Sequence, residues 1–253
     1  MTEEKKILSR EEFENLRLNE AKKMSQDKTL LQDALNIKVR AGHDYYWVHQ
    51  TNWFGEPALQ LTTDLFAYQE AFFNSRPQYV IEIGVAWGGS LLFYSTLMEA
   101  LGGKKVIGVD VFIPDDLKDR LHSHGKISER LILINDSSTD PSTIEKIREI
   151  IGSSNEVMII LDSFHTHDHV LQELRMYSPF IGKGYYLICG DTIIEYQPAA
   201  KRRPRPWGKG NNPKTALDEF LKENDRFVVD QSISNKLLFT NNPGGILRCV
   251  KDL

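Results

Sequence analysis

The sequence predicts an α/β fold built on a mostly parallel sheet, and three features support this prediction. From residue 79 onward, short β-branched runs alternate with amphipathic stretches. The runs are apolar throughout, as expected for parallel strands that helices cover on both faces. Near the C-terminus, an Asn-Pro-Gly-Gly turn signal separates two further runs. Together these features indicate a Rossmann-like sheet with an antiparallel hairpin at its C-terminal edge.

The expected elements follow from this pattern in chain order. Parallel strands are expected at YVIEIG (79–84), KVIGVDV (105–111), LILIND (131–136), VMIILD (157–162) and YYLICGD (185–191). Helices are expected from Ser90, from about 141 and from about 167, which gives right-handed βαβ crossovers. A loop (192–213) then precedes a helix (214–224), FVVDQSI (227–233), KLLFTNN (236–242) and GGILRCVKDL (244–253). We expect the last two segments to form the edge hairpin.

The first 75 residues differ from the rest of the chain. We expect an N-terminal helical and aromatic extension (1–75) packed on a core domain (76–253). Residues 10–40 have polar helical patterning, and Thr63 or Asp64 is the expected N-cap of a further helix.

An aromatic segment at 43–57 lies between these helices. Its large side chains could line a ligand pocket, but packing on the sheet or on another subunit is the favoured interpretation. The residues concerned are Tyr45, Trp47, Trp53 and Phe54.

Composition and charge exclude several classes of protein. A net charge of −4 gives no field that attracts nucleic acid or an anionic membrane. The N-terminus lacks the apolar region of a signal peptide, and no stretch approaches the roughly 18 apolar residues of a membrane span. Cys189 and Cys249 fall in apolar runs typical of buried strands, which excludes a disulfide framework and a cysteine-based zinc site. We expect a cytoplasmic protein without nucleic-acid or membrane partners.

The glycine-rich stretch EIGVAWGGS (82–90) follows the first expected strand and opens a helix. Rossmann-like folds bind nucleotide-containing cofactors at this position. A dinucleotide fingerprint needs glycine where Ala86 stands, and a P-loop needs a lysine between Gly89 and Ser90. Because Ala86 breaks the dinucleotide fingerprint, a nicotinamide-dependent oxidoreductase ranks low. Simple turn chemistry is the other interpretation of these glycines.

The acidic Glu82, the strand-ending Gly84 and Asp110 after the second strand match the pattern of class I S-adenosylmethionine methyltransferases. This resemblance implies that the glycine turn contacts the methionine moiety, that Asp110 accepts the ribose hydroxyls and that Asp136 lies near adenine. Ligands of open α/β sheets lie at the carboxyl edge, so these strand ends predict one crevice. The predicted cofactor-binding residues are Glu82, Gly84, Ala86, Gly88, Gly89, Ser90, Asp110, Asp136, Ser137 and Asp162.

Longer segments resemble a known family. WFGEPALQLTTDLFAYQEAFF, LILINDSSTDP, VMIILDSFHTHDHVLQELRMYSPFIGKGYYLICGDT and NPKTALDEFL are similar to the cephalosporin hydroxylase family, which is itself similar to rhamnosyl O-methyltransferases. The resemblance covers about residues 50–250. It implies a methyltransferase fold, S-adenosylmethionine as cofactor, usually a magnesium ion, and a homo-oligomer.

The resemblance also implies the reacting residues. In this family the first aspartate of D-S-x-H and an acidic pair after the fifth strand hold the cation; Asp162 and Asp191 match, while Gly190 replaces an expected glutamate. In related magnesium-dependent sugar O-methyltransferases the histidine of D-x-x-H is the general base, which His165 matches. Histidine suits this role because its ordinary pKa of about 6.5 lies near working pH. Two aspartates and a substrate diol could still hold magnesium, and Glu195 is close enough in sequence to replace the missing ligand.

The dense histidines of LDSFHTHDHV (161–170) raise a zinc site as another possibility. On a helix, however, His167 points away from His165 and His169, which disfavours zinc. The default for His167 and Asp168 is a solvated first turn, and for His169 it is orientation of the same turn.

The basic run KRRPRPWGKG (201–210) has two interpretations. It is either a solvated loop or a lid, in which Arg202, Arg203 or Arg205 meets a carboxylate or phosphate of the substrate.

The leading hypothesis is an S-adenosylmethionine-dependent O-methyltransferase that acts on a hydroxyl of a small polar acceptor, a sugar or a natural product. In this hypothesis His165 is the general base. The alternative, which Gly190 favours, is a non-catalytic or accessory partner with the same fold in a natural-product hydroxylation or methoxylation pathway. A nicotinamide-dependent oxidoreductase ranks last.

Overall fold

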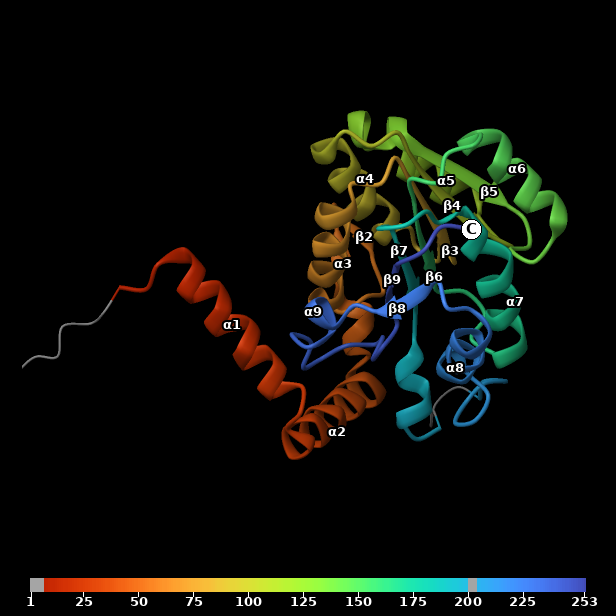
Figure 1. Ribbon diagram of the computed structural model, residues 1–253. Helices are drawn as coiled ribbons and strands as arrows, with labels where there is room; N and C mark the ends of the chain where they lie inside the picture. The colour runs from red at the N-terminus through yellow and green to blue at the C-terminus, as the bar shows by residue number, and fades with distance from the viewer. Residues whose placement is uncertain (1–6, 200–203) are drawn as a thin grey trace, which may run out of the picture.

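The computed structural model describes residues 7–199 and 204–253, and in these ranges it shows a central sheet between two layers of helices (Figure 1). The sheet consists of β3 (Tyr79–Ile83), β4 (Lys105–Asp110), β5 (Leu131–Asn135), β6 (Val157–Leu161), β7 (Tyr186–Cys189), β8 (Phe227–Val229) and β9 (Ile246–Cys249). Its strand order is β5-β4-β3-β6-β7-β9-β8. The strands from β5 to β7 are parallel, whereas β9 and β8 are antiparallel to their neighbours. The predicted α/β class with an antiparallel C-terminal edge is therefore confirmed.

Helices cover both faces of the sheet, as the apolar strands require. One face carries α3 (Thr62–Ser75), α4 (Gly89–Leu101), α5 (Asp115–His122) and α9 (Gln231–Ser234). The other carries α6 (Pro141–Ile151), α7 (His167–Tyr177) and α8 (Pro213–Glu223). Short 3-10 helices complete the connections: η2 (Gly125–Arg130), η3 (Ser178–Phe180) and η4 (Thr192–Tyr196).

Each central strand contributes to two cores because successive side chains point to opposite faces. In β3, Val80 packs with the α3 and α4 layer, whereas Ile81 packs with the α6 to α8 layer. All five residues of β3 and all five of β6 are buried. Cys189 and Cys249 are buried free thiols in β7 and β9, as predicted.

The C-terminal edge differs from the predicted hairpin in its pairing. The strand β9 pairs with β8, and residues 236–242 form no strand. Their polar groups bond instead to α3, because the carboxylate of Asp64 accepts hydrogen bonds from the Thr240 hydroxyl (2.5 Å) and the Asn241 N–H (2.8 Å). The buried carboxylate thus takes the Asn241 N–H, a backbone donor that a strand would use for pairing.

The same contacts correct the predicted start of α3. Leu61 is the N-cap and supplies no side-chain bond, so neither Thr63 nor Asp64 caps the helix. Thr63 donates its hydroxyl to the Phe239 carbonyl (2.6 Å), and Asp64 is fully buried. Both residues therefore tie α3 to the C-terminal segment.

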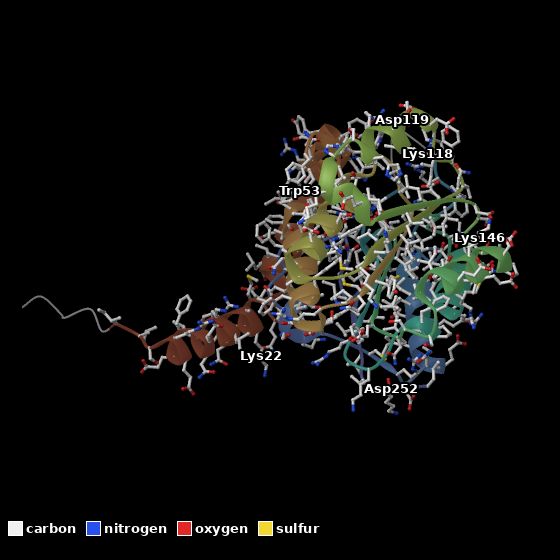
Figure 2. All side chains as sticks on the ribbon, turned by 90° about the horizontal axis from the view of Figure 1, so that it is seen from above. Lys22, Trp53, Lys118, Asp119, Lys146 and Asp252 are labelled. Atoms are coloured by element: carbon white, nitrogen blue, oxygen red, sulfur yellow. The ribbon has the colours of Figure 1, made fainter. Side chains whose placement is uncertain are left out.

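The N-terminal part of the chain contains α1 (Arg10–Met24), α2 (Lys28–Tyr45), η1 (Trp47–Gln50), β1 (Asn52–Trp53) and β2 (Glu56–Pro57). Within α1 only Ala21 is buried, and the helix projects from the body of the protein with its side chains spread around it (Figures 1 and 2). No helix in the described ranges is long and apolar enough to span a membrane. The division of the chain at residue 75 stays a prediction.

The aromatic segment has a mixed role. The Trp53 indole donates to the Thr96 hydroxyl (3.1 Å) and packs edge-on against Phe93 of α4, which fits the packing interpretation. Trp47 packs edge-on against Phe239 in the C-terminal segment. By contrast, Tyr45 and Phe54 are exposed.

We predict that Asp64→Asn destabilises the protein by about 1–3 kcal/mol, because an amide would present N–H to one of the two donors that the carboxylate now accepts. Urea unfolding followed by circular dichroism measures the loss. The control Thr63→Ala removes an exposed bond to the same segment and should cost about 1 kcal/mol or less. Equal losses in the two variants would contradict the role given to Asp64.

Candidate active site

The carboxyl ends of the parallel strands meet at one edge of the sheet. The chain runs from β3 to β4 and β5 on one side and then crosses to β6 on the other, so a topological switch point lies between β3 and β6. Ligands of open α/β sheets bind at such a point. Across it, the Asp162 N–H donates to the Ile83 carbonyl (2.8 Å). On the other side of β3, the Gly84 N–H donates to the Val109 carbonyl of β4 (2.9 Å).

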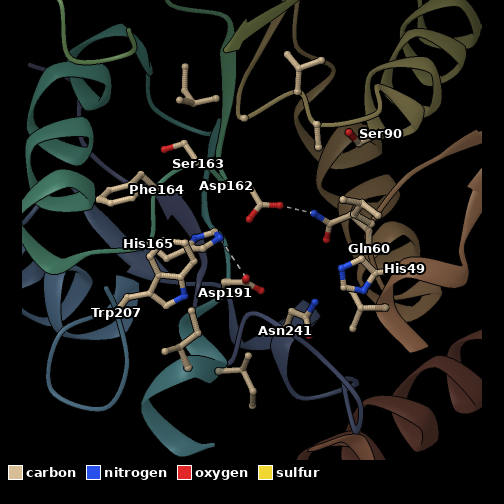
Figure 3. Close-up of a pocket in the computed structure, with 18 of the residues that line it drawn as sticks. His49, Gln60, Ser90, Asp162, Ser163, Phe164, His165, Asp191, Trp207 and Asn241 are labelled. Carbon is tan, nitrogen blue, oxygen red and sulfur yellow. Dashed lines mark hydrogen bonds and ion pairs between the residues drawn. The ribbon is translucent and has the colours of Figure 1, made fainter. Parts of the chain in front are cut away.

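A cavity of about 730 Å³ opens at this edge and extends to α2 and η1 (Figure 3). Most of the predicted site residues line it: Glu82, Gly84, Ala86, Ser90, Asp110, Asp136, Asp162, His165 and Asp191. Gly88, Gly89 and Ser137 do not line it. The structure therefore brings together most, but not all, of the predicted set.

The turn after β3 is shaped by Gly84 and held by Asp110. Gly84 has a φ of +97°, and a side chain there would overlap the Asp162 carbonyl oxygen. One oxygen of Asp110 accepts the N–H of Val85 (2.8 Å), and the other accepts the N–H of Phe112 (3.0 Å). Ala86 also has a positive φ, of 48°, which a side chain adopts at a cost. Gly84, Val85 and Ala86 of this turn all line the cavity.

Glycines 88 and 89 serve packing. A Cβ on Gly88 would meet Leu121 of α5 at 2.6 Å, and one on Gly89 would meet the Pro57 carbonyl carbon of β2 at 2.6 Å. The next residue, Ser90, donates its hydroxyl to the buried Glu82 (2.9 Å). Burial raises the pKa of Glu82 well above its ordinary value.

Asp136, which follows β5, has its charge paired within the protein. Asp136 accepts the Lys146 ammonium (2.7 Å) and the Ser137 N–H (2.8 Å). These bonds lower the pKa of Asp136. Asp136 therefore lines the cavity as a carboxylate, whereas Ser137 faces away from it.

Within the described ranges, one group of three side chains could together hold a metal ion: Asp162, His165 and Asp191. Their ligand atoms lie within 4.8 Å of one another. The His165 Nε2 lies 3.4 Å from an Asp191 carboxylate oxygen, and the Gln60 amide donates to Asp162 at 2.6 Å (Figure 3). Two carboxylates at this separation favour a divalent cation between them, and these oxygens are the ligands that magnesium prefers.

The charges of this group influence one another. Removal from bulk water, followed by the negative charge of Asp191, raises the pKa of Asp162 well above its ordinary value. Burial lowers the pKa of His165, although Asp191 opposes that change. The imidazole is therefore held in its neutral, proton-accepting form.

Gly190, which stands where the resemblance implies a glutamate, lies against Asp162. A Cβ at this position would lie 2.8 Å from a carboxylate oxygen of Asp162 and 2.8 Å from the Leu161 carbonyl oxygen. The present orientation of Asp162 thus excludes a side chain at 190. Glu195 does not replace it, because Glu195 is neither in the group that could hold a metal ion nor among the residues that line the cavity. One of its carboxylate oxygens accepts the N–H of Gly210 (2.8 Å) and the amide of Asn212 (2.6 Å).

Aromatic rings fix the plane of the His165 imidazole. Trp207 meets it edge-on at 4.9 Å between ring centroids and also contacts Phe164 at 5.3 Å. Arg205 lies over the Trp207 ring at 4.9 Å. Of the arginines considered for a lid, Arg202 and Arg203 lie outside the described residues, and Arg205 lines the cavity.

The other two histidines have separate partners. His167 contacts Thr215 (2.9 Å) and Glu219 (3.3 Å) on α8, so the expected solvated first turn is wrong for this residue. His169 lies 2.9 Å from the buried Glu173, which also accepts the Ser163 hydroxyl (2.6 Å). Neither joins His165 in a zinc site; instead, Glu173 orders the turn that follows Asp162.

Several residues that line the cavity were not predicted from the sequence, among them Lys38, Gln60, Trp207 and Asn241. A partial signal existed for Lys38, which shares the inward face of α2 with Ala34 at helical spacing. Trp207 is a large apolar residue in an otherwise basic, proline-containing loop. Gln60 and Asn241 carry no local signal.

Comparison with known proteins gives a consistent result. The family described as Rhamnosyl O-methyltransferase/CmcI matches residues 45–250. A rhamnosyl O-methyltransferase of Mycobacterium bovis (strain BCG / Pasteur 1173P2) is 28% identical over 213 residues, which is 81% of this chain and 82% of the relative. That of Mycobacterium leprae (strain TN) is 30% identical over 182 residues, 71% and 74% of the two chains.

A solved structure of CmcI with Mg-SAM has the same fold. Its TM-score is 0.56 at 20% identity, and the match covers 80% of this chain and 77% of that one.

We predict that Gly84→Ala destabilises the protein by about 3 kcal/mol or more, because it combines a strained φ with overlap at the Asp162 carbonyl. Thermal and urea unfolding measure the loss. Gly102, at the end of α4, is the matched control: it has a similar φ of +79° but open space around it, so alanine there should cost about 1 kcal/mol. If both variants lose the same stability, the close approach of β3 and β6 is not the cause.

Proposed function

The chain belongs to the Rhamnosyl O-methyltransferase/CmcI family, and from that premise we propose that, as an S-adenosylmethionine-dependent O-methyltransferase, it methylates a hydroxyl of a small polar acceptor. One observation carries the proposal: a neutral His165 lies beside two close carboxylates at the switch point of the sheet. A base can take the proton of an acceptor hydroxyl, and a bound cation can lower the pKa of that hydroxyl, so both groups suit O-methylation next to a cofactor crevice.

The cofactor end of the cavity is formed by the glycine turn and the strand ends. S-adenosylmethionine, when bound, supplies an electrophilic methyl group on a sulfonium centre. Gly84 lets the backbone lie close to such a ligand, and Asp110 and Asp136 place carboxylates at the ends of β4 and β5. In the proposal these residues hold the cofactor, so that the acceptor oxygen, the methyl carbon and the sulfur can align.

The cation end is formed by Asp162 and Asp191. We propose that both bind magnesium, whose remaining positions suit water and acceptor hydroxyls. A bound cation would supply positive charge that lowers the pKa of an acceptor hydroxyl. The Gln60 amide fixes the Asp162 side chain, so this carboxylate is oriented before any ligand arrives. With Gly190 in place of an acid, the site offers fewer protein oxygens than a three-carboxylate site.

His165 is the proposed general base. Its pKa is lowered by burial, so the ring can accept the hydroxyl proton as the new C–O bond forms. The Nε2 atom faces Asp191 at 3.4 Å, and that carboxylate stabilises the imidazolium after proton transfer. Trp207 holds the ring edge-on, which limits its rotation.

The accessory-partner alternative loses its main support. Gly190 favoured a non-catalytic partner because it lacks the carboxylate metal ligand expected at this position. This glycine is nevertheless compatible with a close pair of Asp162 and Asp191 carboxylates. Retention of His165 beside that pair supports catalysis.

We expect the purified protein to bind S-adenosylhomocysteine and to release it from S-adenosylmethionine with sugar acceptors. The variant His165→Gln should keep the affinity for S-adenosylhomocysteine and lose about 10²–10⁴-fold in turnover, since only the base is removed. Calorimetry measures binding and mass spectrometry measures transfer. His167→Gln, whose ring contacts α8, is the control and should retain activity. Full turnover in His165→Gln would sink the base assignment, and absent cofactor binding would sink the proposed function.

Asp162→Asn should weaken binding of Mn²⁺, used as a spectroscopic substitute for magnesium, by about tenfold or more, because one of two carboxylate ligands is lost. Electron paramagnetic resonance of free Mn²⁺ measures this without any turnover. Asp168→Asn changes an exposed aspartate on the first turn of α7 and should leave binding unchanged. Equal Mn²⁺ affinity of wild type and Asp162→Asn would contradict the cation site.

A further inference from the structure

Apart from Asp162, His165, His169 and Asp191, the acidic and basic side chains around the cavity come from different elements. The strands β3 to β5 contribute carboxylates: Glu82, Asp110 and Asp136. The helix α2, the 3-10 helix η1 and the segment 204–207 contribute bases: Lys38, His43, His49 and Arg205. The first group faces the cofactor end, where the proposed ligand is cationic. The second group faces the part of the cavity left for the acceptor.

Among these bases, Lys38 is a buried lysine. Its side chain is 6% exposed, and it lies on the face of α2 that points to the cavity. Among the described residues its ammonium forms no ion pair and no hydrogen bond, so it has no direct partner in that part of the chain. A buried charge without a partner is costly. A negatively charged ligand group in the cavity would remove that cost.

The nearby carboxylates do not supply this partner. Asp64 and Asp191 attract the Lys38 charge from a distance. The two oxygens of Asp64, however, already accept Thr240 and Asn241, and Asp191 faces His165. A cation bound between Asp162 and Asp191 would also neutralise Asp191. Lys38 would then meet the acceptor without competition.

A second positive charge is positioned at the same part of the cavity. Arg205 lies over Trp207, and Trp207 touches the ring of the proposed base. Lys38 from α2 and Arg205 from the loop therefore reach the acceptor space from two separate segments.

We infer that the acceptor is an anionic hydroxyl compound whose carboxylate or phosphate group binds Lys38 while its hydroxyl faces His165. The inference rests on the proposed function, since it assigns the acceptor of that same site. An oxyanion paired with a buried ammonium makes a charge-assisted hydrogen bond, about twice as strong as a neutral one. A neutral sugar would leave Lys38 unpaired, and a cationic acceptor would be repelled.

The experiment uses the full chain saturated with S-adenosylhomocysteine and three probes that share one ring: D-glucose, D-glucuronate and D-glucose 6-phosphate. Calorimetry or ligand-observed NMR gives the affinity of each. At least one anionic sugar should bind about tenfold or more tightly than glucose. Lys38→Met, similar in length but uncharged, should abolish this preference, and Lys38→Arg should restore part of it. The control Lys28→Met removes an exposed lysine from the start of the same helix and should keep the preference.

The outcomes separate the two proposals. A preference for glucuronate identifies a carboxylate, and one for the 6-phosphate identifies a phosphate; either supports the inference if Lys38→Met loses it while retaining affinity for S-adenosylhomocysteine. Equal binding of all three sugars, binding of neither anionic sugar, or an unchanged preference in Lys38→Met overturns it while leaving the methyltransferase proposal intact. Failure of wild type to bind S-adenosylhomocysteine overturns the proposed function and this inference with it.

Discussion

The close approach of two glycines to the end of β6 is the constraint on which the site depends. Gly84 lies against the Asp162 backbone, and Gly190 lies against the Asp162 carboxylate and the Leu161 carbonyl. Neither position has space for a Cβ. Because the strands converge so tightly, the turn after β3, Asp162 and Asp191 all meet at one point. A looser packing of β3, β6 and β7 would separate the cofactor crevice from the carboxylate pair.

Around this point, the polar groups are arranged in successive shells that fix geometry before a ligand binds. One oxygen of Asp110 holds the glycine turn by accepting the Val85 N–H, and the other is itself fixed by the Phe112 N–H. The Gln60 amide holds Asp162 in the same way. The Glu173 carboxylate accepts a hydrogen bond from the Ser163 hydroxyl and contacts the His169 ring, which supports the turn after β6. Such support lets a few side chains act at defined distances, since less conformational entropy is lost when the ligand arrives.

The sequence predicted those parts of the protein that depend on local pattern. Buried parallel strands are recognisable as apolar runs in the sequence. The strand ends that carry Gly84, Asp110 and Asp162 could therefore be located from the sequence alone. Lys38 and Gln60 could not, because α2 and the segment before α3 reach the cavity only through long-range packing. The edge pairing was mispredicted for a similar reason: Asp64, far away in the sequence, binds the residues that were expected to form a strand.

The helix α2 places Lys38 over the acceptor part of the cavity, although it belongs to none of the βαβ units. With the acceptor assigned to Lys38 as proposed, recognition of the acceptor and binding of the cofactor are encoded in separate stretches of the chain. Substitutions on the inward face of α2 can change which molecule is chosen without disturbing the sheet that performs the transfer. Proteins built this way can come to use different acceptors through changes in one helix, while the residues of the reaction centre stay the same.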